Sequence, residues 1–414
     1  MTAPHPRICC LDLDTFFVSV ERVLDPELEG RPVIVGGRPG SRGVVTACSY
    51  EVRRFGVRSG MSLTEAARLA PDAVYLPTRG SLYSDYAKRV REIAADFTPV
   101  LQVASIDEMY LDFAGCERMY RRPGDTSDDA TIRRTVARLT ATIRGELGLP
   151  SSAGIGTSRS LAKVASGLAK PAGVLLVPAG EEAALLAPLP VRKLPGIGPV
   201  AAGKLAAIGV ERLGDIADVP PARLRSIFGA WADHVLRGAR GEGSADLSRD
   251  RPAFREHDLA GDAVGSISNE RTFREDVRDP GVLDARLCSL AERVCWRARR
   301  RGVKARTVTL KLRYADFQTL SRSRTLHPTC SEFEIYPVAR DLLTAARTRR
   351  TPIRLLGLAL SNLGFFDEQL DLFDDDRRRN EAVDAIRERF GYDAVWVATS
   401  QPIIRRRRGR DEGL

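Results

Sequence analysis

Acidic residues interrupt two apolar, strand-like runs in the first third of the chain. Asp12 and Asp14 alternate inside CCLDLDTFF, and Asp107 and Glu108 are adjacent inside SIDEMYLD. Because residues two apart in a strand face the same side, the first two carboxylates are predicted to point together while the alternating leucines face the core. Burying unpaired carboxylates is costly, and a divalent cation that prefers hard oxygen ligands, such as Mg²⁺, removes that cost. Each pair alone is also compatible with an ion pair or an edge strand, but two pairs favour metal-assisted phosphoryl chemistry.

Alternating strand and helix patterns over the first 177 residues must position these carboxylates, and they predict an α/β fold. The strand-like stretches are 7–13, 32–37 and 105–113, and the helix-like stretches are 62–70 and 81–97. Short helices broken by Gly and Pro follow, and then a polar, turn-rich linker. The remaining patterns are a helix at 283–302, strands at 306–316 and 352–363, a helix-like 379–390 and a basic tail.

Length and composition predict a soluble protein of two to four domains, since the chain has 414 residues, 43% of them hydrophobic and 29% charged. No apolar run approaches the roughly 20 residues of a membrane helix, and the first residues do not resemble a signal peptide. The seven cysteines form no CxxC pair and are predicted to be reduced thiols, with Cys288 and Cys295 on a buried helix face. The four histidines show no zinc spacing.

Positive charge is concentrated in one segment. Residues 266–363 hold 20 Lys and Arg against 10 Asp and Glu, a net charge of +10 that equals the excess of the whole chain. A solubilising surface is one interpretation. A concentrated basic domain more often binds a polyanion, and nucleic acid is the first candidate.

The acidic motifs, DLDTFFVSVE and SIDEMYLD, closely resemble those of the Y-family DNA polymerases, specifically the DinB or polymerase IV branch. The resemblance covers roughly residues 7–373, with the motifs in the family's order. It implies that Asp12, Asp107 and Glu108 are catalytic and ligate two Mg²⁺ ions per active site, with Mn²⁺ as a substitute. The main-chain carbonyl of Leu13 completes the metal ligands that it implies, whereas Asp14 is expected to support the structure.

The same resemblance assigns residues to the incoming nucleotide. Phe17 matches the steric gate, an aromatic ring under the sugar that a 2′-hydroxyl would hit, and Phe16 is interpreted as core although it is grouped with the nucleotide-binding residues. Tyr50 and Arg53 match residues that bind the triphosphate, for which a guanidinium fork is well suited. Lys170, in AKPAG, matches a triphosphate-binding lysine.

Two further observations concern the segments assigned to the nucleotide. Lys163 lies seven residues before Lys170, which places both on one helix face, but the resemblance gives a role only to the second. Ala47, Cys48 and Ser49 stand where the family usually has Thr-Ala-Asn, so the threonine's hydroxyl contact is in doubt.

DNA contacts are predicted in two places. The pattern LPGIGPVAAGKLAAIGV predicts a helix-hairpin-helix, in which Gly196 and Gly198 let backbone N–H groups approach a phosphate and Lys204 adds positive charge. Such a hairpin grips DNA without reading bases. In the basic segment, Arg322 and Arg324 share one face of a predicted DNA-facing strand.

A short peptide after the last predicted strand completes the motifs. The sequence QLDLF, with Gln369, Leu372 and Phe373, matches the peptide by which bacterial polymerases bind the ring-shaped sliding clamp, their beta subunit. The clamp is therefore an expected partner.

The resemblance implies an α/β multidomain fold of right-hand polymerase architecture: an α/β palm, small fingers, a helical thumb that contains the helix-hairpin-helix, and an α/β little finger. The expected boundaries are palm 1–15 and 81–177, fingers 16–80, thumb 178–242, linker 243–264, little finger 265–364, and a C-terminal tail 365–414 with the clamp-binding peptide 369–373.

The implied function is template-directed DNA synthesis without proofreading, used for translesion synthesis and damage tolerance, by two-metal nucleotidyl transfer from a dNTP to a primer 3′-hydroxyl. Primer-template DNA and deoxynucleoside triphosphates are the expected substrates of a monomer in the bacterial cytoplasm, associated with the nucleoid when active and with no membrane. A non-catalytic DNA-binding adaptor is the alternative, but it should have lost metal-binding carboxylates. A nucleotidyl cyclase would need neither a helix-hairpin-helix nor a clamp peptide.

Overall fold

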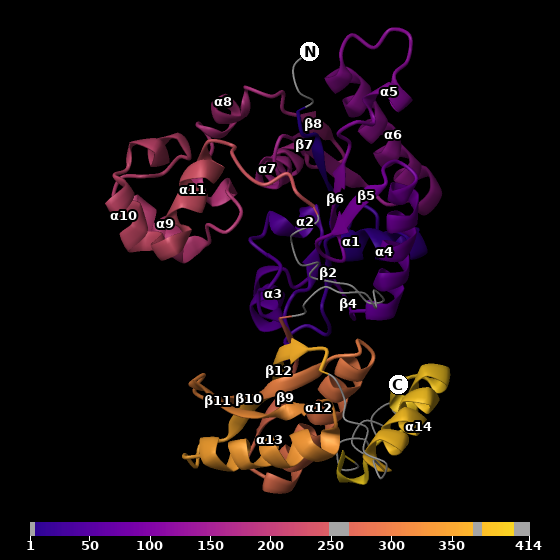
Figure 1. The fold of residues 1–414 in the computed structure, drawn as a ribbon, viewed down its shortest axis with the longest axis vertical. Coiled ribbons are helices and arrows are strands. Elements are labelled where there is room, and N and C mark those ends of the chain that lie inside the picture. The colour runs from indigo at the N-terminus through magenta and orange to yellow at the C-terminus, as the bar shows by residue number, and fades with distance from the viewer. Residues whose placement is uncertain (1–4, 248–264, 367–374, 401–414) are drawn as a thin grey trace. The chain divides into compact units, whose positions relative to one another are not determined.

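The structure is a computed structural model that describes residues 5–247, 265–366 and 375–400. Its internal contacts divide the chain into two compact units, Met1–Arg255 and Glu256–Leu414 (Figure 1). Each unit has its own hydrophobic core and is described separately below.

A five-stranded sheet organises the first unit. Its strands are ordered β5-β6-β1-β7-β8, and only the β7–β8 pair is parallel. The bounds are β1 Ile8–Leu13, β5 Val100–Val103, β6 Glu108–Asp112, β7 Ser151–Gly156 and β8 Val174–Leu176. The predicted strand at 7–13 is thus confirmed at the centre of the sheet, where it pairs with neighbours on both sides.

Alternation along β1 sends its side chains to two different layers. Leu11 and Leu13 join the core formed with α4 (Gly80–Ala95) and α6 (Asp128–Leu147), which contact each other on that face. Cys10 belongs to a second cluster that includes Ala162 of α7 (Arg159–Ala169), and Asp12 lies two residues further along the same strand face. The carboxylate of Asp12 therefore faces the helix α7.

A smaller three-stranded sheet lies between β1 and α4 in sequence. Its order is β3-β2-β4, and it packs with α2 and α3 around a core that contains Ile34, Val52 and Leu63. The bounds of this region are α1 Phe16–Leu24, β2 Val33–Val35, β3 Ala47–Cys48, α2 Tyr50–Arg53, α3 Leu63–Leu69 and β4 Val74–Leu76. Helix α1 and the alternate residues of β2 instead join the core of the large sheet.

Short helices complete the first unit, as the Gly- and Pro-broken pattern predicted. Helix α5 (Glu117–Tyr120) lies before the region of that pattern, and the helices within it are α8 Glu182–Leu186, α9 Pro199–Ala206, α10 Pro221–Phe228 and α11 Ala232–Ala239. Leu205, Leu224 and Val235 form part of the core around the last three.

The second unit contains a four-stranded antiparallel sheet in the order β11-β10-β12-β9. Its bounds are β9 Ser266–Val277, α12 Pro280–Arg299, β10 Lys304–Tyr314, β11 Thr319–Thr329, α13 Glu332–Ala346 and β12 Ile353–Gly364. The helix and the two strands predicted between 283 and 363 are confirmed within a few residues. Helices α12 and α13 contact each other and the sheet.

A C-terminal segment folds onto this unit, and the helix-like pattern at 379–390, which was assigned to a tail, is confirmed as part of it. Helix α14 (Asp375–Phe390) is followed by the single turns η5 (Tyr392–Ala394) and η6 (Ala398–Ser400). Arg387 of α14 donates from Nη2 to Oε1 of Glu292 in α12 at 2.8 Å, and both side chains are at most 1% exposed. Arg299 of α12 similarly pairs with Asp384 at 2.6 Å.

None of the seven cysteines forms a disulfide, and only Cys330 is not fully buried. Cys288 and Cys295 lie on the buried face of α12, as their spacing predicted. Within the described ranges, no helix combines the length and the apolar character that crossing a membrane requires.

Candidate active site

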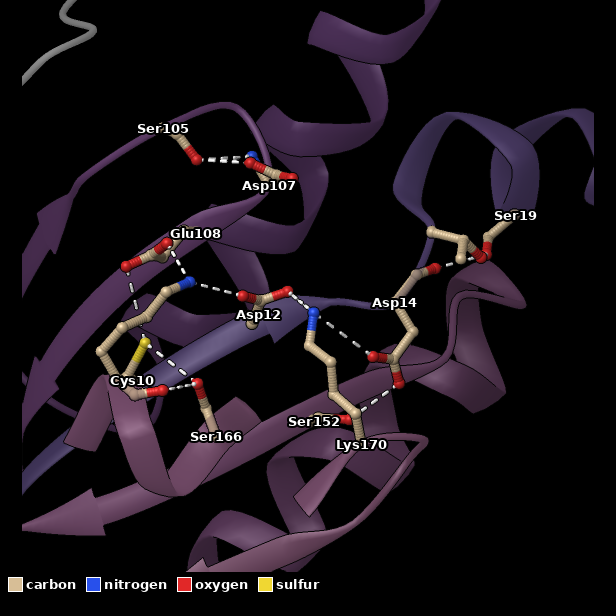
Figure 2. A network of polar contacts seen from close by, with 12 residues as sticks. Cys10, Asp12, Asp14, Ser19, Ser105, Asp107, Glu108, Ser152, Ser166 and Lys170 are labelled. Atoms are coloured by element: carbon tan, nitrogen blue, oxygen red, sulfur yellow. Dashed lines mark hydrogen bonds and ion pairs between the residues drawn. The ribbon is translucent and has the colours of Figure 1, made fainter. Parts of the chain in front are cut away.

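Asp12 and Glu108 lie side by side because β1 and β6 pair antiparallel with these two residues directly opposite each other. Asp12 is 7% exposed. The Lys163 ammonium donates to Oδ2 of Asp12 at 2.7 Å and makes a short contact with Oε2 of Glu108, while Lys170 makes a short contact with Oδ1 of Asp12 (Figure 2). Two lysines of one helix region thus neutralise two adjacent carboxylates, as buried charges require.

Asp107 takes a position that the sequence did not indicate. The strand was expected to include it, but β6 begins at Glu108, and Asp107 lies in the bend between β5 and β6. Its main-chain carbonyl accepts from the N–H of Leu13 at 2.9 Å, whereas its carboxylate accepts a short hydrogen bond from Ser105 (Figure 2). The structure thus brings the backbone of Asp107 to β1 but leaves its side chain apart from the other two carboxylates.

Asp14 connects three segments at the end of β1. Its carboxylate, in a residue only 1% exposed, accepts from Ser152 and from the N–H of Ala172, both at 2.8 Å, and from the hydroxyl of Tyr50 at 3.2 Å. Lys170 lies 3.7 Å from the same carboxylate. Asp14, which was expected to support the structure, thus contacts two of the three residues assigned to the triphosphate, Tyr50 and Lys170.

Tyr50 and Arg53 stand together on the short helix α2. The Arg53 guanidinium lies 4.8 Å from the centre of the Tyr50 ring, and Tyr50 is 37% exposed. Partial burial, and then the charge of Asp14, raise the pKa of Tyr50 to about 12, so its hydroxyl stays protonated as a donor at neutral pH. Thr46 precedes Ala47, the position where the family usually has threonine. Its hydroxyl donates to the carbonyl of Val35 at 2.8 Å.

Phe17 stacks on Tyr83 of α4, with ring centres 4.1 Å apart and planes 13° from parallel. The Tyr83 hydroxyl donates to Glu21 at 2.6 Å, and Arg79 pairs with the same carboxylate, which is buried. The ring beneath Phe17 is therefore fixed by a charged hydrogen-bond network. Phe16 is 3% exposed and packs in the core, where its ring was expected.

Cys10 is a neighbour of this site that the sequence did not single out. Its thiol donates to Oε1 of Glu108 at 3.7 Å and accepts from Ser166 at 3.6 Å. Burial, and then the charge of Glu108, raise the pKa of Cys10 to about 12, so it remains a neutral thiol. The alternation along β1 is the sequence signal that places Cys10 on the same face as Asp12.

The carboxylates fit hard divalent cations in donor chemistry, since carboxylate oxygens are the ligands that Mg²⁺ prefers. As they stand, however, no three His, Cys, Asp or Glu side chains in the described part of the chain converge as a metal cluster. The Asp107 carboxylate instead bonds to Ser105, and the Asp12 carboxylate bonds to Lys163.

The predicted hairpin residues lie at the start of α9. Gly196 has φ +93°, and a Cβ there would come 2.1 Å from the ring of Trp231, so the fold itself requires glycine. Gly198 precedes the helix with open space around it, and Lys204 is exposed on α9. The backbone at Gly198 is therefore open to the close approach of a DNA strand.

Arg322 and Arg324 share one face of β11 and are both exposed, as their spacing predicted. The β10–β11 register pairs Arg324 with Val308, which is fully buried, so this face is the one covered by helices, and Arg324 pairs with Asp341 of α13 at 3.0 Å. Lys311 points to the opposite, open face of the sheet and pairs with Glu270 at 2.6 Å. The assignment of the two arginines to DNA stays a prediction. Gln369, Leu372 and Phe373 lie outside the described residues.

Family models match three parts of the chain. The impB/mucB/samB family matches residues 11–167, the C-terminal domain of that family matches 264–372, and the HHH motif of the IMS family matches 179–210.

Whole-length relatives agree with these matches. The chain is 40% identical to DNA polymerase IV of Dehalococcoides mccartyi strain 195, over 94% of this chain and 96% of the relative. It is 38% identical to DNA polymerase IV of Halorhodospira halophila, over 89% and 98%. Among solved structures, the Y-family DNA polymerase chimera Dbh-Dpo4(243-245)-Dbh superposes with a TM-score of 0.73 at 26% identity, over 86% of this chain and 98% of that chain. The insertion ternary complex of Dbh DNA polymerase gives 0.57 at 26% identity, with the same coverage.

Proposed function

Since the chain belongs to the impB/mucB/samB family of Y-family DNA polymerases, in its DinB or polymerase IV branch, we propose that it copies damaged DNA templates without proofreading. It is a DNA-directed DNA polymerase with the right-hand architecture expected from the sequence. The observation that carries the proposal is the pairing of Asp12 with Glu108 across β1 and β6, with Lys170 reaching the same point. This is an anionic centre beside a cationic side chain that is suited to a triphosphate.

Asp12, Asp107, Glu108 and the carbonyl of Leu13 are the residues that would hold divalent metal. Two Mg²⁺ ions, or Mn²⁺ in their place, would when bound favour attack by the primer 3′-hydroxyl and neutralise charge on the triphosphate and the departing pyrophosphate. For this ligand set to assemble, the Asp107 carboxylate must leave Ser105, while the backbone of Asp107 already bonds to Leu13.

Tyr50, Arg53 and Lys170 would bind and orient the triphosphate. Asp14 accepts from the Tyr50 hydroxyl and lies 3.7 Å from the Lys170 ammonium, and the Arg53 guanidinium lies over the Tyr50 ring. An arriving phosphate offers the same donors stronger, charge-assisted hydrogen bonds. Asp14 then serves to keep these donors aimed at one point before the nucleotide arrives, which lowers the ordering cost of binding.

Phe17 would select the sugar by steric exclusion. The ring cannot retreat into the protein, because it stacks on Tyr83, whose hydroxyl is tied to Glu21. A ribose hydroxyl that meets the gate would have to push against two stacked rings held by the buried Glu21 carboxylate, whereas deoxyribose would not.

The remaining parts would hold DNA and the replication machinery. The hairpin at Gly196 and Gly198 and the basic sheet of the second unit are suited to sequence-independent contacts with phosphates. We propose that the QLDLF peptide, residues 369–373, docks on the sliding clamp and that the protein works as a monomer on DNA in the bacterial cytoplasm, at the nucleoid.

Primer extension in Mg²⁺ tests the proposal. The wild-type chain should extend a primer on an undamaged and on a lesion-containing template, whereas Asp107→Ala should lose extension by several orders of magnitude while its duplex affinity stays close to normal. Asp72→Ala, which removes an exposed carboxylate in the turn before β4 (Val74–Leu76), is the matched control and should extend normally. DNA binding without extension by the wild-type chain would instead support the non-catalytic adaptor.

A further inference from the structure

Lys163 is a partly buried cation to which the proposed function gives no task. It lies in the middle of α7, seven residues before Lys170, and its side chain is 32% exposed. Lys170 has the triphosphate as its proposed ligand. Lys163 instead reaches the two carboxylates themselves.

The ammonium of Lys163 bridges Asp12 and Glu108. It donates to Oδ2 of Asp12 at 2.7 Å and to Oε2 of Glu108, and these two residues are direct partners in the β1–β6 register. A divalent cation shared by the same two carboxylates would take lone pairs that the ammonium now occupies. Both cations cannot use them at once, and their like charges repel at such a separation.

The other groups around Lys163 keep it charged and in place. The carboxylates of Asp12 and Glu108 both accept from the ammonium, and the Cys10 thiol donates to the other oxygen of Glu108. Lys170 donates to the other carboxylate oxygen of Asp12, Oδ1, and the Ser166 hydroxyl donates to the Cys10 thiol. The two lysines thus contact different oxygens of Asp12, and Figure 2 shows the Asp107 side chain turned towards Ser105.

We propose that Lys163 is a positioning residue that takes the place of a divalent cation in the metal-free protein and must withdraw from Asp12 and Glu108 when the metal binds. This inference rests on the proposed metal-binding function of those carboxylates. It has two consequences. The ammonium stabilises Asp12 and Glu108 while no metal is bound. It also weakens metal binding until a nucleotide arrives, because the negative triphosphate then compensates Lys163 for the lost ion pair.

Mn²⁺ titration of the nucleotide-free, full-length protein tests the inference, with unbound Mn²⁺ measured by electron paramagnetic resonance. Lys163→Met keeps the aliphatic stem and removes the charge, so it should bind Mn²⁺ about tenfold or more tightly than wild type. That is the size of effect that a charge a few Å away has on a carboxylate's affinity for a proton. Lys88→Met, on an exposed lysine of α4 whose side chain is 68% exposed, is the matched control and should bind like wild type.

Thermal melting supplies the second readout. In EDTA, Lys163→Met should melt below Lys88→Met, because Asp12 and Glu108 then repel each other without the bridging ammonium, and Mn²⁺ should restore more of its stability than it adds to wild type. An equal melting temperature in EDTA would overturn the inference. Lys163→Gln, which is also uncharged, must behave in the same way, so that a folding defect peculiar to one variant cannot decide the result.

Asp12→Asn separates this inference from the proposed function. If Asp12→Asn loses Mn²⁺ binding while Lys163→Met binds no more tightly than wild type, Lys163 does not compete with the metal and only the inference is overturned. If Asp12→Asn binds Mn²⁺ normally, the metal site itself is misassigned and both are overturned.

Discussion

The buried ion pair between Arg387 and Glu292 makes a quantitative prediction about the C-terminal segment. Arg387 uses only Nη2, which donates to Glu292 at 2.8 Å and to the carbonyl of Val395 at 3.1 Å. Its Nε and Nη1 are buried without a hydrogen-bond partner among the described residues, while the guanidinium lies 4.6 Å from the centre of the Tyr392 ring. The arginine is therefore desolvated but only partly compensated.

Removing one member of such a pair leaves a charge in the core. Arg387→Met deprives Glu292 of its guanidinium partner, and breaking a buried pair from one side typically costs about 3–5 kcal/mol. Replacing both members is different, because the desolvation cost of both charges disappears. Since two of the three nitrogens of Arg387 are unsatisfied, we expect Glu292→Gln combined with Arg387→Met to recover most of that loss. The glutamine keeps an acceptor for the N–H of Val397, which now donates to Glu292 at 3.1 Å.

Urea unfolding followed by tryptophan fluorescence measures these changes in the full chain. Trp296 and Trp396 lie at this junction, where Trp296 packs against Tyr392 at 4.9 Å, and only Trp231 belongs to the first unit. The single variant should shift their transition strongly, and the double variant should shift it little. A loss below about 1 kcal/mol for Arg387→Met, the value of an exposed ion pair, would refute the burial argument. Additive losses in the double variant would refute the argument about desolvation.

The remaining predictions concern sugar choice, DNA and the clamp. Phe17→Ala should raise ribonucleotide incorporation far more than it lowers deoxynucleotide use, measured as the ratio of the two kcat/KM values. An unchanged ratio would show that the Phe17 ring only packs in the core. DNA affinity should fall about 10³–10⁵-fold between 50 and 200 mM salt if about 6–10 phosphates are contacted, and deleting residues 265–414 should flatten that slope unless the contacts lie in the catalytic unit. Changing Leu372 and Phe373 to Ala should leave synthesis on a short primer unchanged but abolish stimulation by a loaded clamp. A loss of melting temperature with stimulation intact would show that these side chains pack on the protein instead.

Most of the fold could be predicted from regular patterns in the sequence. The alternation in β1 predicted which residues face the core, and it correctly placed Asp12 on the other side, because a strand has only two faces. The spacing of Cys288 and Cys295 likewise identified the buried face of α12, since residues seven apart return to the same side of a helix.

Tertiary contacts explain what the sequence missed. Asp107 was predicted to be a strand residue because it lies inside the strand-like run 105–113, but the strand starts one residue later and Ser105 donates to the carboxylate. Lys163 was visible on the right helix face, yet nothing local shows that α7 packs against β1 and delivers its ammonium to Asp12. Helix α14 was foreseen as a helix, but its docking depends on a pair formed with a residue 95 positions earlier in the chain.

The buried thiols have a practical consequence for measuring motion in this protein. Six of the seven cysteines are buried, and burial raises the pKa of Cys9 and Cys295, so their reactive thiolate forms are suppressed. Cys330 is the one partly exposed thiol. A Cys330→Ser background should therefore accept maleimide dyes almost only at cysteines introduced on purpose. A donor dye in one unit and an acceptor dye in the other would then report, by energy transfer, whether the distance between the two units changes when DNA binds.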